Sequence, residues 1–439
     1  MTDTLDGAKT RFINRGKKRC SVSALSIPRA SDWGAEWVKY EEARVLVLSA
    51  LKTHPPESVL LAEAMGRTLA RDIKARENIP PFTKATMDGY AVKAEDTRAA
   101  GRDNAVELEV TEDLPAGRVS RKSVGPGQAV RIMTGAPLPK GADAVVMVED
   151  TEKSGGRVKV RREVKPGANI GQAGEDLKKG ELALERGAVI GPAETGLLAA
   201  AGLARVPVVR RPKLAVIATG DEIVEPGDRK GPGQIRNSNG PALLAMALRA
   251  GADAKYLGIA RDRSSSLRAK LARAKGADIL VLAGGVSVGD YDLVKDELRA
   301  AGVRPVFWQV RIKPGKPVFF GRRGSRLVFG LPGNPTSAMV TFLLFAQPAI
   351  ERMLGRTNPG PRGGRAVLTE DVVLKPGRKQ FLRGVLEAEG AVLKVAPYAD
   401  QKSGVLRSMV HSRVLIVVPA DVSRLEKGRD VEILYIDGA

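Results

Sequence analysis

Two carboxylates follow directly after a predicted strand near the middle of the chain. Residues 214–218 form a short apolar run, and the turn that comes next carries Asp221 and Glu222. Ionised carboxylates suit magnesium, which takes one or two such ligands together with the phosphates of a substrate. The alternative is structural, with Asp221 capping the turn and Glu222 in solvent. The sequence leaves both interpretations open.

A glycine-rich loop follows a second apolar run at 279–283. Gly284 and Gly285 let the backbone approach a ligand closely and present its N–H groups to it. Ser287 adds a hydroxyl donor, and Asp292 adds negative charge. Asp292 also stands where it could cap the helix that follows, so a structural role for it stays open.

Two lysines and a proline-bounded turn complete the set of groups suited to an anion. Lys313 and Lys316 lie in a stiff turn, because the prolines beside them fix the backbone angle φ. A third apolar run, 327–329, leads into the turn 330–335 and a helix predicted over 336–345. The N-terminus of such a helix favours an anion. Together these segments predict one composite site for a phosphorylated ligand.

The elements that position these groups have the pattern of an α/β domain. Short continuous apolar runs are typical of buried parallel strands, and ligands of open α/β sheets bind at the carboxyl ends of the strands. Helical patterns at 241–249, 265–273 and 293–301 alternate with the apolar runs, as in βαβ units. We therefore expect the three loops to meet at one edge of a sheet.

The rest of the chain divides at changes in composition and pattern. Helical spacing occurs at 37–52, 58–70 and 192–201, whereas short β-like runs dominate after about residue 80 and again after the linker 359–364. The expected divisions are a disordered basic extension (1–36), a discontinuous helical linker domain (37–79 and 175–211), a β-rich module (80–174), an α/β domain (212–360) and a C-terminal small β-barrel domain (361–439).

Composition excludes several classes of site. The chain has one cysteine, Cys20, and only two histidines, His54 and His411, which excludes a zinc site of the usual kind and a Cys-His nucleophilic pair. A lone cysteine fits the reducing cytoplasm. We expect neither a membrane span nor a signal peptide, because no apolar run has the required length and position.

The chain is strongly basic, with 71 Lys and Arg against 50 Asp and Glu and a formal charge of +21. Nucleic acid is not the expected partner, because aromatic residues make up only 4% of the chain and no nucleic-acid-binding signature accompanies the charge. A positive field that attracts small anionic substrates fits the charge equally well. A surface bias that serves solubility remains the simplest alternative.

The motifs of the α/β segment resemble those of the molybdopterin molybdenumtransferase family, which includes bacterial MoeA and the E-domain of gephyrin. The resemblance covers residues of about 38–437 and leaves only the basic extension outside it. The segments that carry it are 219–222, 284–292, 313–317 and 330–335 in the α/β segment, and 80–82, 86–91, 131–139, 174–176 and 403–408 elsewhere.

The resemblance implies a fold, a reaction and a set of site residues. The α/β segment would be a three-layer αβα domain of the molybdopterin-binding type. With Mg²⁺, molybdate and adenylylated molybdopterin would give molybdenum cofactor and AMP. The residues implied for catalysis are Asp88, Thr134, Asp176, Glu222, Asp262 and Asp292, of which Glu222, Asp262 and Asp292 form the acidic set for the metal. Those implied for substrate binding are Gly284, Gly285, Ser287, Lys313, Lys316, Pro332, Pro335 and Ser403.

The resemblance also implies an assembly. In the family, an elongated homodimer brings the β-rich module of one subunit over the α/β cleft of the other, so Asp88 and Thr134 would act in trans. Molybdopterin adenylyltransferase and molybdoenzyme chaperones would be protein partners. One position departs from the pattern: Gln309 stands where some members carry a lysine. Arg311 or Arg322 are the candidates to compensate for the missing charge.

Two other functions compete with this interpretation. Molybdopterin adenylyltransferases have a related α/β domain, but their loop should resemble Thr-Gly-Gly-Thr-Gly, where this chain has residues 283–287. A scaffold that binds peptides, as the gephyrin E-domain does, needs no acidic set. The presence of Glu222, Asp262 and Asp292 favours the enzyme over the scaffold.

Overall fold

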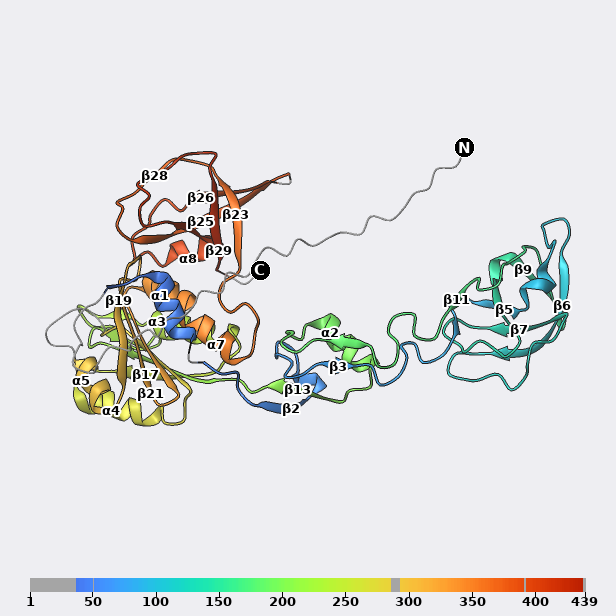
Figure 1. The fold of residues 1–439 in the computed structure, drawn as a ribbon, viewed down its shortest axis with the longest axis horizontal. Coiled ribbons are helices and arrows are strands. Elements are labelled where there is room, and N and C mark those ends of the chain that lie inside the picture. Colours follow the sequence, from blue (N-terminus) through green and yellow to red (C-terminus); the bar gives the residue numbers. More distant parts are fainter. Residues whose placement is uncertain (1–36, 50, 286–292, 391, 437–439) are drawn as a thin grey trace.

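The computed structural model describes residues 37–49, 51–285, 293–390 and 392–436. The molecule is elongated (Figure 1). An α/β domain and a β-barrel lie together at one end, a β-rich module lies at the other end, and a narrow linker connects them. No helix in the described ranges is both long enough and apolar enough to cross a membrane.

A seven-stranded sheet forms the centre of the α/β domain, with the strand order β1-β19-β21-β22-β18-β14-β17. The strands β17, β14, β18 and β22 are parallel neighbours, whereas β21 is antiparallel to β22 and β19. The bounds of the strands are β1 Trp37–Val38, β14 Lys213–Thr219, β17 Asp253–Ala260, β18 Ile279–Ala283, β19 Arg304–Val310, β21 Pro317–Arg323 and β22 Arg326–Leu331. The three strands predicted from apolar runs are confirmed as β14, β18 and β22.

Helices cover both faces of this sheet, which confirms the three-layer αβα arrangement. One core joins the sheet to α1, α3 and the helical run that begins with α6, and a second core joins its other face to α4 and α5. The helices are α1 Tyr40–Leu48, α3 Asn239–Arg249, α4 Ser264–Arg273, α5 Leu293–Ala300, α6 Pro335–Thr341 and α7 Gln347–Met353. The helices predicted at 241–249, 265–273 and 293–301 are confirmed as α3, α4 and α5.

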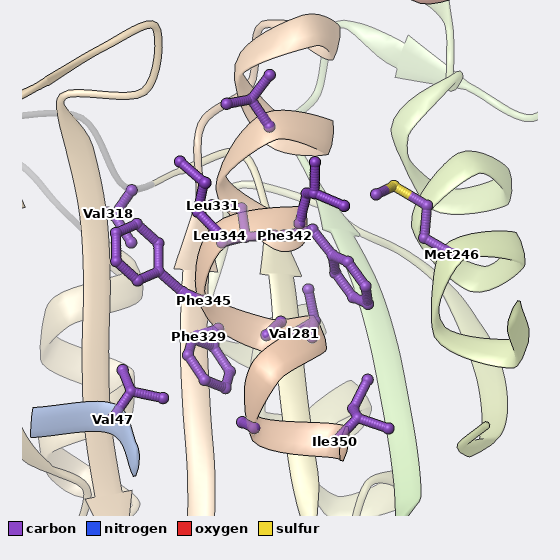
Figure 2. Close-up of a cluster of buried hydrophobic side chains, with 14 of the residues drawn as sticks. Val47, Met246, Val281, Val318, Phe329, Leu331, Phe342, Leu344, Phe345 and Ile350 are labelled. Atoms are coloured by element: carbon purple, nitrogen blue, oxygen red, sulfur yellow. The ribbon is translucent and has the colours of Figure 1, made fainter. Parts of the chain in front are cut away.

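The helix predicted over 336–345 is the start of a longer helical run. Between α6 and α7 it contains a π-helical segment, Phe342–Ala346, all of whose residues are buried. Figure 2 shows Phe342, Phe345 and Ile350 of this run packed over the sheet, near Val281 and Phe329. Each fully buried side chain of this size contributes about 1.5–3 kcal/mol. This packing fixes the position of the loop that precedes α6.

The β-rich module is built on a six-stranded sheet with the order β8-β5-β7-β6-β10-β9. Its strands are β5 Gly89–Val92, β6 Val106–Leu114, β7 Gln128–Ile132, β8 Ala144–Met147, β9 Thr151–Ser154 and β10 Arg157–Val160, and the short pair β4 Lys84–Ala85 and β11 Ile170–Gly171 lies beside it. A Cβ atom on Gly89 would lie 1.9 Å from the carbonyl oxygen of Val146. Only glycine therefore fits where β5 begins against β8.

The linker contains more strand than the sequence predicted. The helix expected over 58–70 is wrong: β2 Pro56–Leu60 and a single 3₁₀ turn, Leu61–Glu63, occupy that segment. The cause is a long-range pairing, because β2 bonds to β13 Arg205–Val209. A second pair, β3 Ile73–Lys74 with β12 Leu182–Leu184, and the helix α2 Pro192–Ala200 complete the linker.

The helix predicted within 37–52 is present as α1, but it packs on the α/β sheet and not in the linker. Its buried residues Tyr40, Ala43 and Val47 belong to the core of the α/β domain. The strand β1 just before it pairs with β19 at the edge of the same sheet. The described chain therefore begins in the α/β domain and then leaves it for the linker.

The C-terminal region is a closed β-barrel, as predicted. Pairing runs from β25 through β26, β23, β29 and β27 and returns to β25, so the sheet has no free edge. The strands are β23 Gly363–Leu368, β25 Lys379–Glu389, β26 Val392–Pro397, β27 Val414–Val418 and β29 Asp430–Tyr435. A short strand of the α/β domain, β20 Ile312–Lys313, pairs with β25 and ties the two domains together.

Candidate functional site

The carboxylate of Glu222 lies over Gly220, just past the end of β14. A Cβ atom on Gly220 would lie only 2.2 Å from Glu222 Oε2, and the φ of Gly220 is +139°. The positive φ therefore favours glycine there, and a larger residue would in addition displace the Glu222 side chain. The Glu222 side chain is exposed, and its carbonyl accepts a hydrogen bond from Ile235 N–H at 2.8 Å. The loop thus presents an ionised carboxylate at the carboxyl edge of the sheet.

Asp221 and Asp262 hold each other through their backbones. The N–H of Asp221 donates to Asp262 Oδ2 at 3.3 Å, and the N–H of Asp262 donates to Asp221 Oδ1 at 3.2 Å. This reciprocal pair joins the turn after β14 to the turn after β17. Each carboxylate keeps an oxygen that accepts no bond from the other residue. The structural interpretation of Asp221 and a role in the site are therefore compatible.

Arg261 joins the same two turns, and nothing in the sequence indicated this role. Its Nη1 donates to the carbonyl oxygens of Gly220, Asp221 and Ile223 at 3.3, 3.1 and 2.8 Å. A guanidinium nitrogen that bonds to three carbonyls of one loop fixes that loop and adds positive charge beside the carboxylates. No local sequence signal separates Arg261 from the other arginines, because its role depends on the neighbouring strand.

The glycine-rich loop packs directly on the end of β14. A Cβ atom on Gly284 would lie 2.9 Å from the carbonyl oxygen of Thr219, and one on Gly285 would lie 2.8 Å from Thr219 Oγ1. Both glycines have positive φ, +95° and +63°. The start of the loop therefore packs tightly on β14, and its predicted close approach to a ligand stays a prediction. Ser287 and Asp292, predicted for substrate and metal, lie outside the described residues.

The proline-bounded turn 332–335 and the residue after it contact two other segments. Asn239 Nδ2, at the start of α3, donates to the Gly333 carbonyl at 2.7 Å. Asn334 Nδ2 donates to Ser403 Oγ at 3.0 Å, and Thr336 Oγ1 donates to the Ser403 carbonyl at 2.6 Å. The predicted residues Pro332, Pro335 and Ser403 are thus brought together at the start of α6.

Arg383 in the barrel was not predicted, and it holds the loop that carries Ser403. Its side chain is fully buried, with Nε donating to Ser408 Oγ at 2.9 Å and Nη2 donating to the carbonyls of Asp400 and Lys402 at 3.1 and 3.2 Å. Burial lowers the pKa of this guanidinium. A buried cation is costly unless it is well bonded, so these bonds rigidify the loop beside the anion pocket.

The two predicted lysines have different surroundings. Lys313 is exposed at the end of β20. Lys316 is half-buried, and its Nζ lies 4.4 Å from the ring centroid of Trp37, a cation–π contact. Between them, Gly315 packs so tightly on α6 that a Cβ atom there would lie 2.3 Å from Thr341 Cγ2. The turn is thus held against α6, with Lys313 exposed.

The structure also locates the position where the sequence departs from the family pattern. Gln309 is buried in β19, opposite Pro317 of β21. The suggestion that Arg322 compensates for the missing lysine is wrong, because Arg322 pairs with Arg304 at the other end of the same two strands. Five residues of strand separate Pro317 from Arg322, which is about 17 Å at the rise of a β-strand. Arg311 is exposed just beyond β19 and stays a candidate.

Asp88 and Thr134 form a separate unit in the β-rich module. The N–H and the Oγ1 of Thr134 both donate to Asp88 Oδ1, each at 2.7 Å. These two bonds hold the pKa of the exposed Asp88 carboxyl below its ordinary value. Asp88 directly precedes Gly89, the position where β5 has no room for a side chain. A carboxylate is thus fixed, ionised and open to solvent.

Asp176 lies where the linker meets the module. Its N–H donates to the Ile79 carbonyl at 3.1 Å, next to the bridge between Ile79 and Leu177. The side chain is exposed. Within one chain, the module and the α/β domain are at opposite ends of the molecule (Figure 1). The structure therefore brings the α/β and barrel residues together and keeps Asp88, Thr134 and Asp176 away from them.

Comparisons with known proteins bear on the whole of this arrangement. Residues 38–202 match the model of the MoeA N-terminal region (domain I and II), 215–352 match a probable molybdopterin binding domain, and 365–436 match the MoeA C-terminal region (domain IV). A curated molybdopterin molybdenumtransferase from Bacillus subtilis is 38% identical over 404 residues, which cover 91% of this chain and 94% of that protein. The chain belongs to the molybdopterin molybdenumtransferase family.

Two further relatives have the same extent. Molybdopterin molybdenumtransferase 2 of Mycobacterium tuberculosis is 38% identical over 400 residues, covering 90% of this chain and 98% of that protein. The crystal structure of a molybdopterin biosynthesis MoeA protein from Pyrococcus horikoshii covers 92% of this chain and all of its own, with 35% identity and a TM-score of 0.78. The likeness to the molybdenumtransferase family therefore includes the module, the linker and the barrel as well as the α/β domain.

Proposed function

We propose that this chain inserts molybdate into adenylylated molybdopterin, with release of AMP and formation of molybdenum cofactor. The observation that carries the proposal is the convergence of Glu222, Asp262 and three anion-suited loops at the carboxyl edge of one parallel sheet. Both substrates are anions, so the charge of +21 would attract them. Full-length kinship with molybdopterin molybdenumtransferases supports the same reaction.

Magnesium is the cofactor that this reaction implies, and the donor set fits it. Magnesium is held in proteins by one or two carboxylates together with substrate phosphates, and Glu222 and Asp262 are two exposed carboxylates on adjoining loops. Among the described residues, no three Asp, Glu, His or Cys side chains are grouped for a metal. The ion would therefore depend on the substrate, with Asp292 as a further ligand. When bound, it would neutralise charge on the phosphate oxygens.

The chain's own residues then have separable tasks. The backbone N–H of Gly285 would approach the phosphates closely, whereas the N–H of Gly284 already donates to the Leu331 carbonyl at 3.0 Å. Lys313 would neutralise an oxyanion, whereas Lys316 would serve mainly to hold its turn against Trp37. Ser403, fixed between Asn334 and Thr336, would bind the anion from the barrel side. The result is a pocket in which molybdate and the phosphate of the leaving AMP are held side by side.

We further propose that the active site is shared between two subunits of a homodimer. The Asp88 carboxylate is fixed and exposed, but the β-rich module that carries it lies at the opposite end of the chain from the α/β domain that carries Glu222 (Figure 1). If both act in one reaction, the module must come from a second copy. The lone cysteine fits a cytoplasmic location for this enzyme.

The direct test measures AMP. Purified protein is given adenylylated molybdopterin, molybdate and Mg²⁺, and AMP is followed by chromatography. We expect AMP to appear only when all three are present, and chelation of Mg²⁺ by EDTA to stop its release until magnesium is restored in excess. No AMP from the complete mixture would refute the assignment, and undiminished release in EDTA would refute the role of magnesium.

A further inference from the structure

A second cavity lies at the edge of the α/β sheet opposite the candidate site. It has a volume of about 930 Å³. Its walls are α4, α5, the residues just before β18 and the hairpin between β21 and β22. The glycine-rich loop follows the end of β18, whereas this cavity lies where β18 begins. Nothing in the proposed reaction uses it.

The two carboxylates in the wall already have cationic partners. Glu297, which is buried, accepts two bonds from Arg268, at 2.6 Å from Nε and 2.9 Å from Nη2. Asp278 accepts two bonds from Arg210, at 3.1 and 3.3 Å, and another from the N–H of Lys213 at 2.8 Å. Both carboxylates thus already have an arginine partner, and Asp278 in addition attracts Arg326 of the cavity wall.

Three other cations line the cavity, and two of them face each other. Arg323 and Arg326 are directly opposite in the hairpin between β21 and β22, and like charges in that position destabilise a sheet. Lys275 approaches from the end of α4. Within the described part of the chain, no carboxylate forms an ion pair with any of the three. Burial, and then the charge of Arg323, lower the pKa of Arg326.

The remaining wall is apolar and could accept a flat or aliphatic body. Leu271, Ala277 and Ala301 contribute to it, and Ser325 adds a hydroxyl beside the arginines. The volume is within the range of small-molecule sites, which combine apolar walls with a few polar groups. A cavity lined by several cations and by apolar side chains matches a ligand that has phosphate and apolar parts.

We propose that this cavity binds an organic phosphate, with the phosphate on Arg323, Arg326 and Lys275 and the apolar body against Leu271 and its alanine neighbours. Guanidinium groups suit this task, because their donors match phosphate oxygens in bidentate geometry. The inference does not depend on the proposed reaction, since no residue of the cavity belongs to the candidate site.

A simpler role accounts for only part of the charge. The α4 and α5 helices both end at this cavity, and helix C-termini attract cations. That attraction explains Lys275, which follows the end of α4. Arg326 also has a structural bond, because its Nε donates to the Ala277 carbonyl at 2.8 Å. Neither role explains why Arg323 stands opposite it in the hairpin. Absence of organic phosphate binding would leave helix capping as the role of the cations.

Hydrogen–deuterium exchange on the full-length chain locates binding directly. The probes are AMP, inorganic phosphate and adenosine, which separate the phosphate from the apolar body. We expect AMP to protect peptides that cover 264–278 and 319–328 from exchange. AMP should also bind at least about tenfold more tightly than inorganic phosphate or adenosine, because each of these lacks one of the two parts that the cavity would recognise. Equal affinity of phosphate and AMP, or binding of adenosine alone, would overturn the proposal.

Matched variants test the residues. Arg323→Gln with Arg326→Gln should weaken AMP binding at these peptides by about tenfold or more, and high salt should weaken it in the wild type. Arg273→Gln changes an exposed residue of α4 that does not line the cavity, and the AMP affinity of this variant should stay within about twofold of the wild type. The double variant relieves a like-charge pair but loses the bond from Arg326 Nε to the Ala277 carbonyl, so Arg323→Gln alone, which keeps that bond, is measured beside it and should also weaken AMP binding. Wild-type affinity in the double variant would overturn the proposal.

Discussion

The α/β domain and the β-rich module each fix an acidic residue through backbone N–H groups, but they do so on different scales. In the α/β domain, Asp221 and Asp262 exchange bonds between two loops, and Arg261 bonds a third segment to them. In the module, Thr134 alone supplies both donors to Asp88. The first arrangement is a multi-loop pocket within one chain. The second is a single fixed charge that becomes part of a pocket only against another surface.

The packing around the two regions also differs, because two domains surround the α/β pocket and a single sheet supports Asp88. The α/β pocket is bounded by elements from two domains, since the barrel contributes Ser403 and Arg383. The Asp88 unit rests on one sheet, where the end of β5 leaves no room for a side chain at Gly89. We therefore expect substitutions in the α/β pocket to act within one subunit, and substitutions at Asp88 to act across subunits.

The largest expected effect comes from Glu222. Glu222→Ala removes a carboxylate that would hold magnesium, and AMP release should fall on the order of 1,000-fold, equivalent to several kcal/mol of lost charge stabilisation. Asp228→Ala is the matched control, because Asp228 is exposed on the loop that follows and is held by its backbone, with the N–H donating to the Glu225 carbonyl at 3.1 Å and the carbonyl accepting from Arg236 at 2.9 Å. Similar losses of AMP release in both variants would mean that Glu222 has no special role in the reaction.

Asp88→Ala should cost about 100-fold, as the loss of one fixed polar group in an active site often does. The sharper experiment mixes this variant with Glu222→Ala. A heterodimer has one site that lacks both groups and one site with both, so about half of the wild-type activity should return if the site is shared. A confirmed heterodimer that stays inactive would mean that the two regions do not meet across subunits.

The two lysines allow a finer comparison within the α/β pocket. Lys313→Ala should raise the KM for molybdate by about tenfold, since it removes an exposed cation without disturbing packing. Lys316→Ala breaks the contact with Trp37 and should lower stability by about 0.5–1 kcal/mol, with a smaller change in KM. Steady-state kinetics and thermal melts separate the two. The reverse order of the KM effects would reassign the anion-binding lysine.

The smallest effect concerns protonation in the module. Thr134→Val removes the hydroxyl donor but keeps the backbone N–H, so the pKa of Asp88 should rise toward its ordinary value. Because hydrogen bonds to the ionised form lower a carboxyl pKa, the wild-type Asp88 should stay charged to lower pH than the variant does. Carboxyl-selective NMR titration measures both. An unchanged pKa would show that the N–H alone determines it.

Sequence reasoning succeeded where the signal is local and periodic. Apolar runs gave β14, β18 and β22, and the rule that ligands bind at the carboxyl ends of parallel strands brought their loops to one edge. It failed where a distant segment decides the outcome. Leu60, Leu61 and Ala64 have helical spacing, but the backbone of 56–60 bonds to β13, about 150 residues further along the chain. The local sequence around residue 60 does not contain β13, so it cannot show the pairing that replaces the helix.

The same limit applies to the site. Arg261 and Arg383 are two of 71 basic residues, and only their neighbours in space distinguish them. Arg322 looked close to Gln309 along the chain, but the pairing of β19 with β21 separates them. Gly89 shows the opposite case, because its place in a motif was evident, whereas the carbonyl of Val146 that requires glycine was not.

The short strand β20 has a mechanical consequence. It pairs with β25 of the barrel, and its last residue is Lys313; the barrel is also tied to the start of α6 through Ser403. The barrel and the α/β domain are thus joined at two separate points, one beside Lys313 and one at the start of α6. Rotation of the barrel about either point would break the other, so we expect the barrel to keep one orientation relative to the sheet.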